Sequence, residues 1–141
     1  MTARSSFPGS EPQVKFRRHI PYDVPFLLVV DDEEFLCREI VEYLRYHGLA
    51  ANYETDPNEA VAIIDRERPR AILIDINMDG LSGRRLVEIV QNMGFNGGIL
   101  LMSGDPGAVY QANFEGANVL HVLEKPIPLP ALERFVRGVL R

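Results

Sequence analysis

The stretch FLLVVDD, residues 26–32, decides the fold, because five apolar residues in a row are followed directly by two acidic ones. Three later stretches repeat this arrangement of an apolar run before a polar residue: AILID (71–75), ILLMS (99–103) and VLHVLEK (119–125). Continuous rather than alternating apolar residues indicate strands that are buried on both faces, as in a parallel sheet. Since the carboxyl ends of parallel strands line one crevice, we expect these polar residues to meet there.

Segments with helical spacing of apolar residues separate the strands. We predict strands at about 26–30, 50–54, 71–75, 98–102 and 119–123, and helices at about 33–47, 56–66, 82–93, 107–115 and 128–140. Asp56 before Pro57, and Ser82, are signals for the start of a helix. Right-handed crossovers place helices on both faces of such a sheet. The expected fold is α/β: a flavodoxin-like (βα)5 three-layer sandwich whose five parallel strands have the order 2-1-3-4-5.

Length and composition are those of one globular domain, with 141 residues of which 46% are hydrophobic and 25% charged. The single cysteine, Cys37, forms no internal disulfide and is assigned no role, and it fits a reducing compartment. We predict a cytoplasmic protein without membrane contact, because no apolar stretch approaches the roughly 20 residues of a membrane span and no signal peptide is evident. The net charge of −5 argues against direct binding of nucleic acid.

The first residues differ in composition from the rest. Residues 1–24 are rich in Pro, Ser and Gly and lack periodicity, so we predict a disordered leader before a domain at 25–141. Residues 1–25 carry four basic and two acidic side chains. The leader is therefore either a solvated tail, which composition favours, or an arm that docks on an acidic partner.

The predicted crevice combines three carboxylates, a hydroxyl and an ammonium group, from Asp31, Asp32, Asp75, Ser103 and Lys125. Each has an ordinary interpretation alone, as a turn, a cap or a solvated residue. Together, the carboxylates repel one another unless a cation joins them, and hard oxygen ligands suit Mg²⁺ or, as a second choice, Mn²⁺. The cation and Lys125 would favour the approach of a phosphate, and attack by the Asp75 carboxylate on phosphorus would form an acyl phosphate. If the bond between Lys125 and Pro126 is cis, the ammonium group is aimed into the crevice.

With these motifs in order, residues 25–141 resemble the receiver domain of response regulators in two-component signalling, the CheY-like superfamily. VVDDEE matches the family's acidic pair, DINMDGLSG its phosphoacceptor, MSG its switch hydroxyl and EKP its lysine. The resemblance makes Asp75 the phosphoacceptor, and it implies metal ligands from Asp31 (partly through water), Asp32, Asp75 and the main-chain carbonyl of Asn77. No other cofactor is expected.

The resemblance also implies the partners. A histidine kinase or histidine phosphotransfer protein would donate the phosphoryl group, and the domain would catalyse only its own phosphorylation and dephosphorylation. We expect a stand-alone receiver, either a monomer or a phosphorylation-dependent dimer, that signals to an unknown downstream protein. The output face would comprise the fourth helix, fifth strand and fifth helix. Phe114, Leu132 and Phe135 are candidate contacts there, although their spacing favours the core for most of them.

Two positions depart from the family pattern. Asp79 stands where Pro is frequent, which predicts a looser loop and an added negative charge. Val122 stands where an aromatic switch residue is common, so coupling to the Ser103 loop is in question, and His121 should face the other side of the strand as a structural or exposed residue. Asn77 and Asp105 occupy positions that tune acyl-phosphate lifetime, and this polar pair predicts seconds to minutes.

Three alternatives remain open. A haloacid-dehalogenase-type phosphatase also uses a strand-end Asp and magnesium, but it needs a second Asp where Asn77 stands, and it usually carries cap insertions. A receiver-like scaffold without phosphorylation is disfavoured by the complete set of acidic, hydroxyl and lysine residues. The third alternative is the N-terminal fragment of a longer regulator. A DNA-binding regulator is disfavoured by the acidic domain unless the chain is such a fragment.

Overall fold

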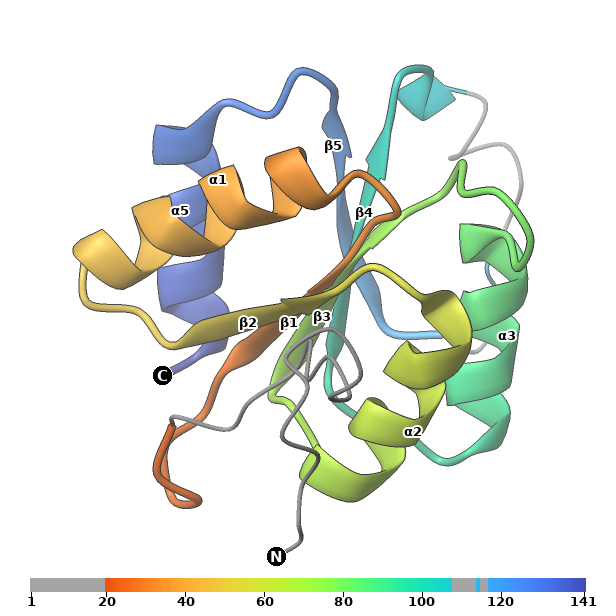
Figure 1. Ribbon diagram of the computed structural model, residues 1–141, viewed down its shortest axis with the longest axis horizontal. Helices are drawn as coiled ribbons and strands as arrows, with labels where there is room; N and C mark the ends of the chain where they lie inside the picture. The colour runs from red at the N-terminus through yellow and green to blue at the C-terminus, as the bar shows by residue number, and fades with distance from the viewer. Residues whose placement is uncertain (1–19, 108–113, 115–116) are drawn as a thin grey trace, which may run out of the picture.

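In the part of the chain that the structure describes, five parallel strands form one central sheet (Figure 1). The computed structural model describes residues 20–107, 114 and 117–141. The strands are β1 (Leu27–Val30), β2 (Ala51–Glu54), β3 (Ala71–Asp75), β4 (Gly98–Ser103) and β5 (Val119–Glu124). Their order across the sheet is β2-β1-β3-β4-β5, so the predicted flavodoxin-like order is confirmed.

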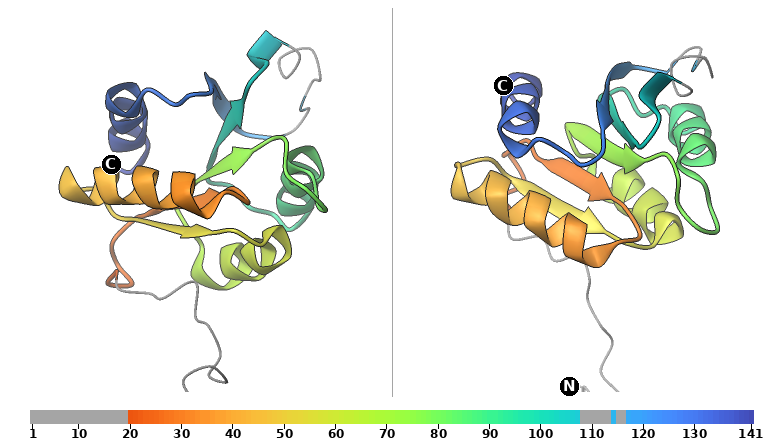
Figure 2. Two further views of the ribbon diagram at one scale, coloured as in Figure 1. Left: turned by 45° about the horizontal axis from the view of Figure 1, so that its top comes forward. Right: turned by 90° about the horizontal axis from the view of Figure 1, so that it is seen from above.

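Helices cover both faces of the sheet. They are α1 (Glu34–Tyr46), α2 (Pro57–Glu67), α3 (Gly83–Asn92) and α5 (Leu129–Val139). Figure 1 and Figure 2 show α1 and α5 together on one face and α2 and α3 on the other, which makes the three predicted layers. The predicted fourth helix at 107–115 and the predicted leader at 1–24 lie largely outside the described residues. None of the described helices combines the length and the hydropathy that crossing a membrane requires.

Local signals in the sequence set where α2 and α3 begin. The Asp56 carboxylate accepts a hydrogen bond from the main-chain N–H of Asn58, and Pro57 follows in the first helical position. The Ser82 hydroxyl accepts a hydrogen bond from the N–H of Arg85 at 3.2 Å. Each cap satisfies an N–H group that the helix itself cannot, so both predicted starts are confirmed.

The core consists of two apolar layers, one on each face of the sheet. Alternate residues of β1 belong to different layers. Leu28 and Val30 pack towards α2 and α3, whereas Leu27 and Val29 pack towards α1 and α5. The second layer includes Cys37 and Leu132, both fully buried. Leu132, one of the candidate output contacts, faces inward with Val136, so the core interpretation that its helical spacing favours is confirmed.

The start of α3 lies directly against the main chain at the end of β3. The N–H of Gly83 donates a hydrogen bond to the carbonyl of Ile76 at 3.2 Å. A Cβ atom at residue 83 would lie 2.3 Å from the carbonyl oxygen of Asp75, closer than real Cβ contacts allow. Only glycine therefore permits this approach, and the approach fixes the loop between β3 and α3 against Asp75.

We expect Gly83→Ala to lower the free energy of unfolding by about 1–3 kcal/mol, because the added methyl group forces main-chain atoms apart. Urea denaturation followed by circular dichroism measures this. Gly138→Ala is the matched control: a Cβ there meets nothing within 4 Å. Since alanine favours the helix, the control should be unchanged or up to about 1 kcal/mol more stable. Equal stability of Gly83→Ala and the wild type would contradict the steric argument.

Candidate functional site

Three carboxylates meet at the carboxyl edge of the sheet. Asp31 and Asp32 follow β1, Asp75 ends β3, and these strands are neighbours in register. One carboxylate oxygen from each residue lies within 4.8 Å of the others. Asp31 and Asp75 are 0% and 4% exposed, whereas Asp32 is exposed. The cluster therefore opens to solvent on the side of Asp32.

Lys125 contacts two of these carboxylates. Its Nζ atom lies 3.0 Å from Asp75 Oδ2 and 3.2 Å from Asp31 Oδ2. The peptide bond between Lys125 and Pro126 is cis, which answers a question that the sequence left open. Among the described residues, no Lys or Arg side chain contacts Asp32. The Lys125 ammonium group therefore forms ion pairs only with the two buried carboxylates.

Each carboxylate also accepts one main-chain N–H at 3.0 Å. The N–H of Glu33 donates to Asp31 and that of Asn77 to Asp75, both within turns that span two residues. The N–H of Asp79 donates to Asp32 across 47 residues of sequence. Sequence reasoning considered only the looseness and charge that Asp79 adds and missed this bond. The available signal was that a residue other than proline keeps its N–H group.

Burial and the like charge of Asp75 together disfavour ionisation of Asp31. Burial is the largest cause that raises the pKa of Asp31, and the charge of Asp75 adds to it. The N–H of Glu33 and the Lys125 ammonium group lower the pKa, and the net value is about 6. Partial burial alone would lower the pKa of Lys125, but its hydrogen bonds and the charges of both aspartates outweigh this effect and raise the pKa. One ammonium group does not balance three carboxylates.

The donor set fits a hard divalent cation. It consists of carboxylate oxygens close enough to share one ion, with excess negative charge and an opening to water, which suits Mg²⁺ or Mn²⁺. Asn77 lies on the loop beside the cluster, where its N–H contacts Asp75. The role of its carbonyl as a fourth ligand stays a prediction.

Ser103 lies at the end of the adjacent strand, but its hydroxyl is engaged elsewhere. Its Oγ atom accepts a hydrogen bond from the N–H of Asp105 at 2.9 Å. In the described part of the chain, that hydroxyl makes no hydrogen bond to the carboxylates or to the Lys125 side chain. The connection between the two residues is through main chain, because the N–H of Lys125 donates to the carbonyl of Ser103 at 2.9 Å.

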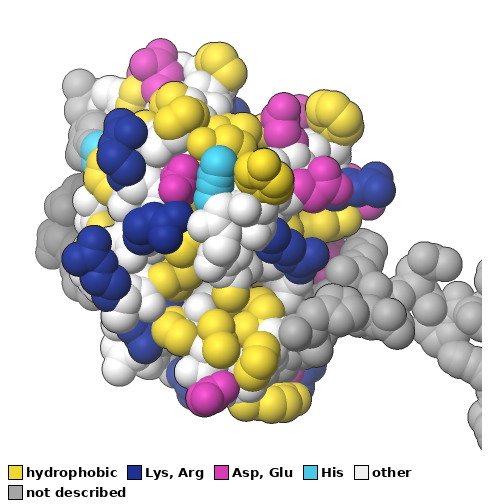
Figure 3. Space-filling model, turned by 90° about the vertical axis from the view of Figure 1, so that its left-hand side faces the viewer, with side chains coloured by type: hydrophobic (Ala, Val, Ile, Leu, Met, Phe, Trp, Pro, Cys, Tyr) yellow, Lys and Arg dark blue, Asp and Glu magenta, His cyan; other side chains and the backbone are white. Residues whose placement is uncertain are grey.

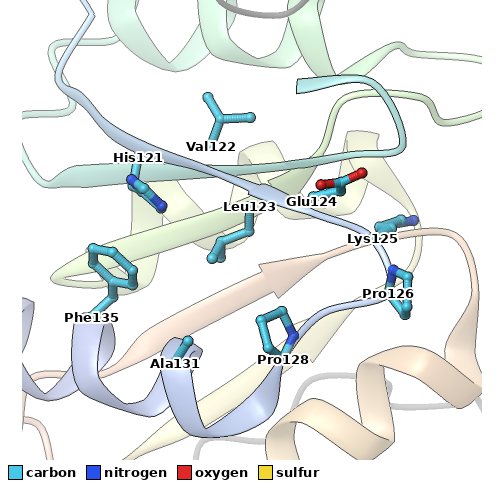
Figure 4. A pocket seen from close by; sticks show the side chains of 9 residues that line it. All are labelled: His121, Val122, Leu123, Glu124, Lys125, Pro126, Pro128, Ala131 and Phe135. Atoms are coloured by element: carbon cyan, nitrogen blue, oxygen red, sulfur yellow. The ribbon is translucent and has the colours of Figure 1, made fainter. Parts of the chain in front are cut away.

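The two residues before Leu123 on β5 point to opposite sides, as predicted. Figure 4 shows Val122 on one side of the strand and His121 on the other, facing Phe135. The rings of His121 and Phe135 stack with centroids 4.2 Å apart, and Val122 is buried in the layer beneath α2 and α3. Half-buried Phe114 packs against that same layer. His121 is therefore a structural residue of the contact between β5 and α5.

Comparisons with known proteins identify a family and several similar proteins. The family model of the response regulator receiver domain matches residues 27–137. The response regulator MprA of Mycobacterium leprae (strain TN) is 25% identical over 115 residues, which cover 82% of this chain and 50% of that protein. The MprA of Mycolicibacterium vanbaalenii is 26% identical with the same coverage. The chain thus spans about half the length of the curated relatives it matches.

Solved structures show the same fold. The Francisella response regulator 1452 receiver domain has a TM-score of 0.73 and 24% identity, covering 82% of this chain and 96% of that one. The Vibrio cholerae chemotaxis protein CheY4 has a TM-score of 0.73 and 21% identity, covering 83% and 99%.

The raised pKa of Asp31 predicts how stability depends on pH. The folded protein holds this proton up to about pH 6, whereas the carboxyl of the unfolded chain titrates near 3.8. Ionisation of Asp31 therefore lowers the free energy of unfolding as pH rises from about 4 to 6. In metal-free protein we expect Asp31→Asn to raise that free energy by roughly 1–3 kcal/mol at pH 7 and to lose this advantage below about pH 4.

Urea denaturation at several pH values measures the effect. Asp65→Asn is the control, since its carboxylate is exposed and its 3.9 Å contact with Arg68 lies at the surface. That control should change stability by less than about 0.5 kcal/mol at every pH. A destabilised Asp31→Asn at pH 7 would contradict the prediction.

Proposed function

The chain belongs to the response regulator receiver domain family, and from that premise we propose that Asp75 accepts a phosphoryl group in a Mg²⁺-dependent reaction. A histidine kinase or histidine phosphotransfer protein is the proposed donor. The observation that carries the proposal is the contact of the Asp75 carboxylate with Lys125 at 3.0 Å inside a cluster of acidic residues. It supports a nucleophile whose surroundings suit a phosphoryl group.

The Asp75 carboxylate is held by both of its oxygens. Oδ1 accepts the N–H of Asn77 and Oδ2 accepts Lys125 Nζ. In the proposed step, one carboxylate oxygen attacks phosphorus, the bond from phosphorus to the imidazole nitrogen of the donor breaks, and the electron pair leaves with the imidazole. Lys125 stays protonated at neutral pH because its pKa is raised, so its ammonium group can bind an oxygen of the transferred phosphoryl group.

The three aspartates, with the carbonyl of Asn77, would hold the cation. When bound, Mg²⁺ would supply positive charge that offsets the negative charge of the carboxylates and of the phosphoryl group. Asp31 is the residue whose ionisation this charge assists, since burial opposes it. This role for the acidic cluster is in keeping with the family, whose members bind Mg²⁺ through acidic residues.

The proposed output face comprises the predicted fourth helix, β5 and α5. A groove of about 400 Å³ opens there between β5 and α5, lined among others by His121, Lys125 and Phe135 (Figure 4). Phe135 is 37% exposed and Leu120 48%. On the neighbouring side of the molecule, which Figure 3 shows, the described basic side chains are interspersed with acidic and hydrophobic ones. Such a mixture supports a protein partner rather than nucleic acid.

The action of the domain alone, its oligomeric state and its cytoplasmic location stay predictions. The curated relatives are about twice as long as the matched region, with 50% of their length covered.

Incubation with acetyl phosphate and Mg²⁺ should add one phosphoryl group (~80 Da) to the intact mass, because the Asp75 carboxylate is positioned as the nucleophile. Asp75→Asn and wild type in EDTA should show no gain, and Asp65→Asn should behave as wild type. If folded wild type gains no mass from acetyl phosphate or from a histidine-phosphorylated protein, the scaffold alternative is favoured instead.

The phosphorylated form should decay within seconds to minutes. Asn77 and Asp105 are both polar and exposed beside the site, so water has access to the acyl phosphate. Removal of the donor followed by timed mass measurements gives the lifetime. Asp105→Leu should lengthen it severalfold, because an apolar side chain displaces water from the mouth of the site, whereas Asp65→Asn should leave it unchanged. Phosphoryl groups that persist overnight in the wild type would contradict this prediction.

A further inference from the structure

Asp32 is held differently from the other two carboxylates of the cluster. Lys125 contacts Asp31 and Asp75 at 3.2 and 3.0 Å. In the part of the chain that the structure describes, the Asp32 side chain accepts a single hydrogen bond, from the N–H of Asp79 to Oδ2 at 3.0 Å. The orientation of the exposed carboxylate therefore depends on the loop between β3 and α3.

We propose that the main-chain N–H of Asp79 is a positioning group for metal binding, because it holds the Asp32 carboxylate ready for a divalent cation. The inference rests on the proposed function, in which that cation binds at the three aspartates. A carboxylate offers about four acceptor sites on two oxygens, so one N–H on Oδ2 leaves Oδ1 and a second lone pair for the metal. An exposed side chain that is already oriented loses less conformational freedom on binding.

The loop presents this N–H from a defined position. Met78, directly before it, is 7% exposed and packs in the layer beneath α2 and α3. Gly80, directly after it, has a φ of 75°, a conformation that suits glycine. Gly83 then anchors the end of the loop against Asp75. The N–H of Asp79 lies between these fixed points, so its direction follows from the packing of the loop.

The N–H and the carboxylate of Asp79 have separable effects. The exposed carboxylate adds negative charge near the cluster and attracts a cation wherever its N–H points. Alanine and asparagine at residue 79 remove that charge and keep the N–H. Proline removes both. A comparison of proline with alanine therefore reports the loss of the N–H together with the fixed φ of proline, and a comparison of asparagine with wild type reports the charge.

The test measures binding of Mn²⁺ to the full chain from the electron paramagnetic resonance signal of the free ion. Outer-shell partners of metal ligands typically contribute 10- to 100-fold in affinity, and at this exposed site we expect the lower end. Asp79→Pro should therefore bind about tenfold more weakly than Asp79→Ala, with Asp79→Asn close to Asp79→Ala. Equal affinities of the proline and alanine variants, within twofold, would overturn the inference.

A second measurement needs no variant at residue 79. In the nitrogen–proton correlation spectrum of the wild type, the amide proton of Asp79 should lie downfield, stay there on saturation with Mg²⁺, and move upfield in Asp32→Ala. Movement upfield on addition of Mg²⁺ would show that the bond breaks on binding and would also overturn the inference. If Asp79→Pro does not fold, this spectrum decides the matter.

Failure of the proposed function gives a distinct result. Folded wild type that binds neither ion would refute the metal site, and the positioning role would fall with it. Wild type that binds Mn²⁺ while the proline and alanine variants bind equally well would refute the positioning role alone.

Discussion

Repulsion among three carboxylates at one sheet edge is the constraint on which the arrangement of the site depends. Oxygens of Asp31, Asp32 and Asp75 lie within 4.8 Å of one another, and two of these side chains are buried. The surrounding groups all oppose that repulsion: one ammonium group contacts the two buried carboxylates, and one main-chain N–H reaches each of the three. Burial of the two apolar layers of the core stabilises the sheet against the remaining repulsion among the carboxylates.

Much of this arrangement could be predicted from the sequence, because residues that follow parallel strands lie at the same edge of the sheet. A polar residue after each apolar run was enough to predict that the acidic residues and Lys125 meet at one edge, and the flavodoxin-like fold class supplied the strand order. Residues whose position follows from local rules, such as Asp56 and Ser82 as caps, were also predicted. These features depend only on short segments of sequence, the apolar runs and the helix caps, and on the rule that the carboxyl ends of parallel strands share one edge.

The features that could not be predicted depend on how separate segments meet in space. The bond from Asp79 to Asp32 joins residues 47 apart and follows from the path of one loop. The hydroxyl of Ser103 turns to the N–H of Asp105 instead of the carboxylates, which the order of residues does not specify. A pattern identifies which residues share an edge, but the hydrogen bonds among them depend on loop geometry.

The close contact between Gly83 and Asp75 has a mechanical consequence. Their main chains approach so closely that a single added carbon would lie 2.3 Å from the Asp75 carbonyl oxygen. Two segments in such contact cannot slide past one another, so the first turn of α3 and the end of β3 move as one body. A force applied to α3 from outside would reach Asp75 through the backbone, without any side chain to relay it.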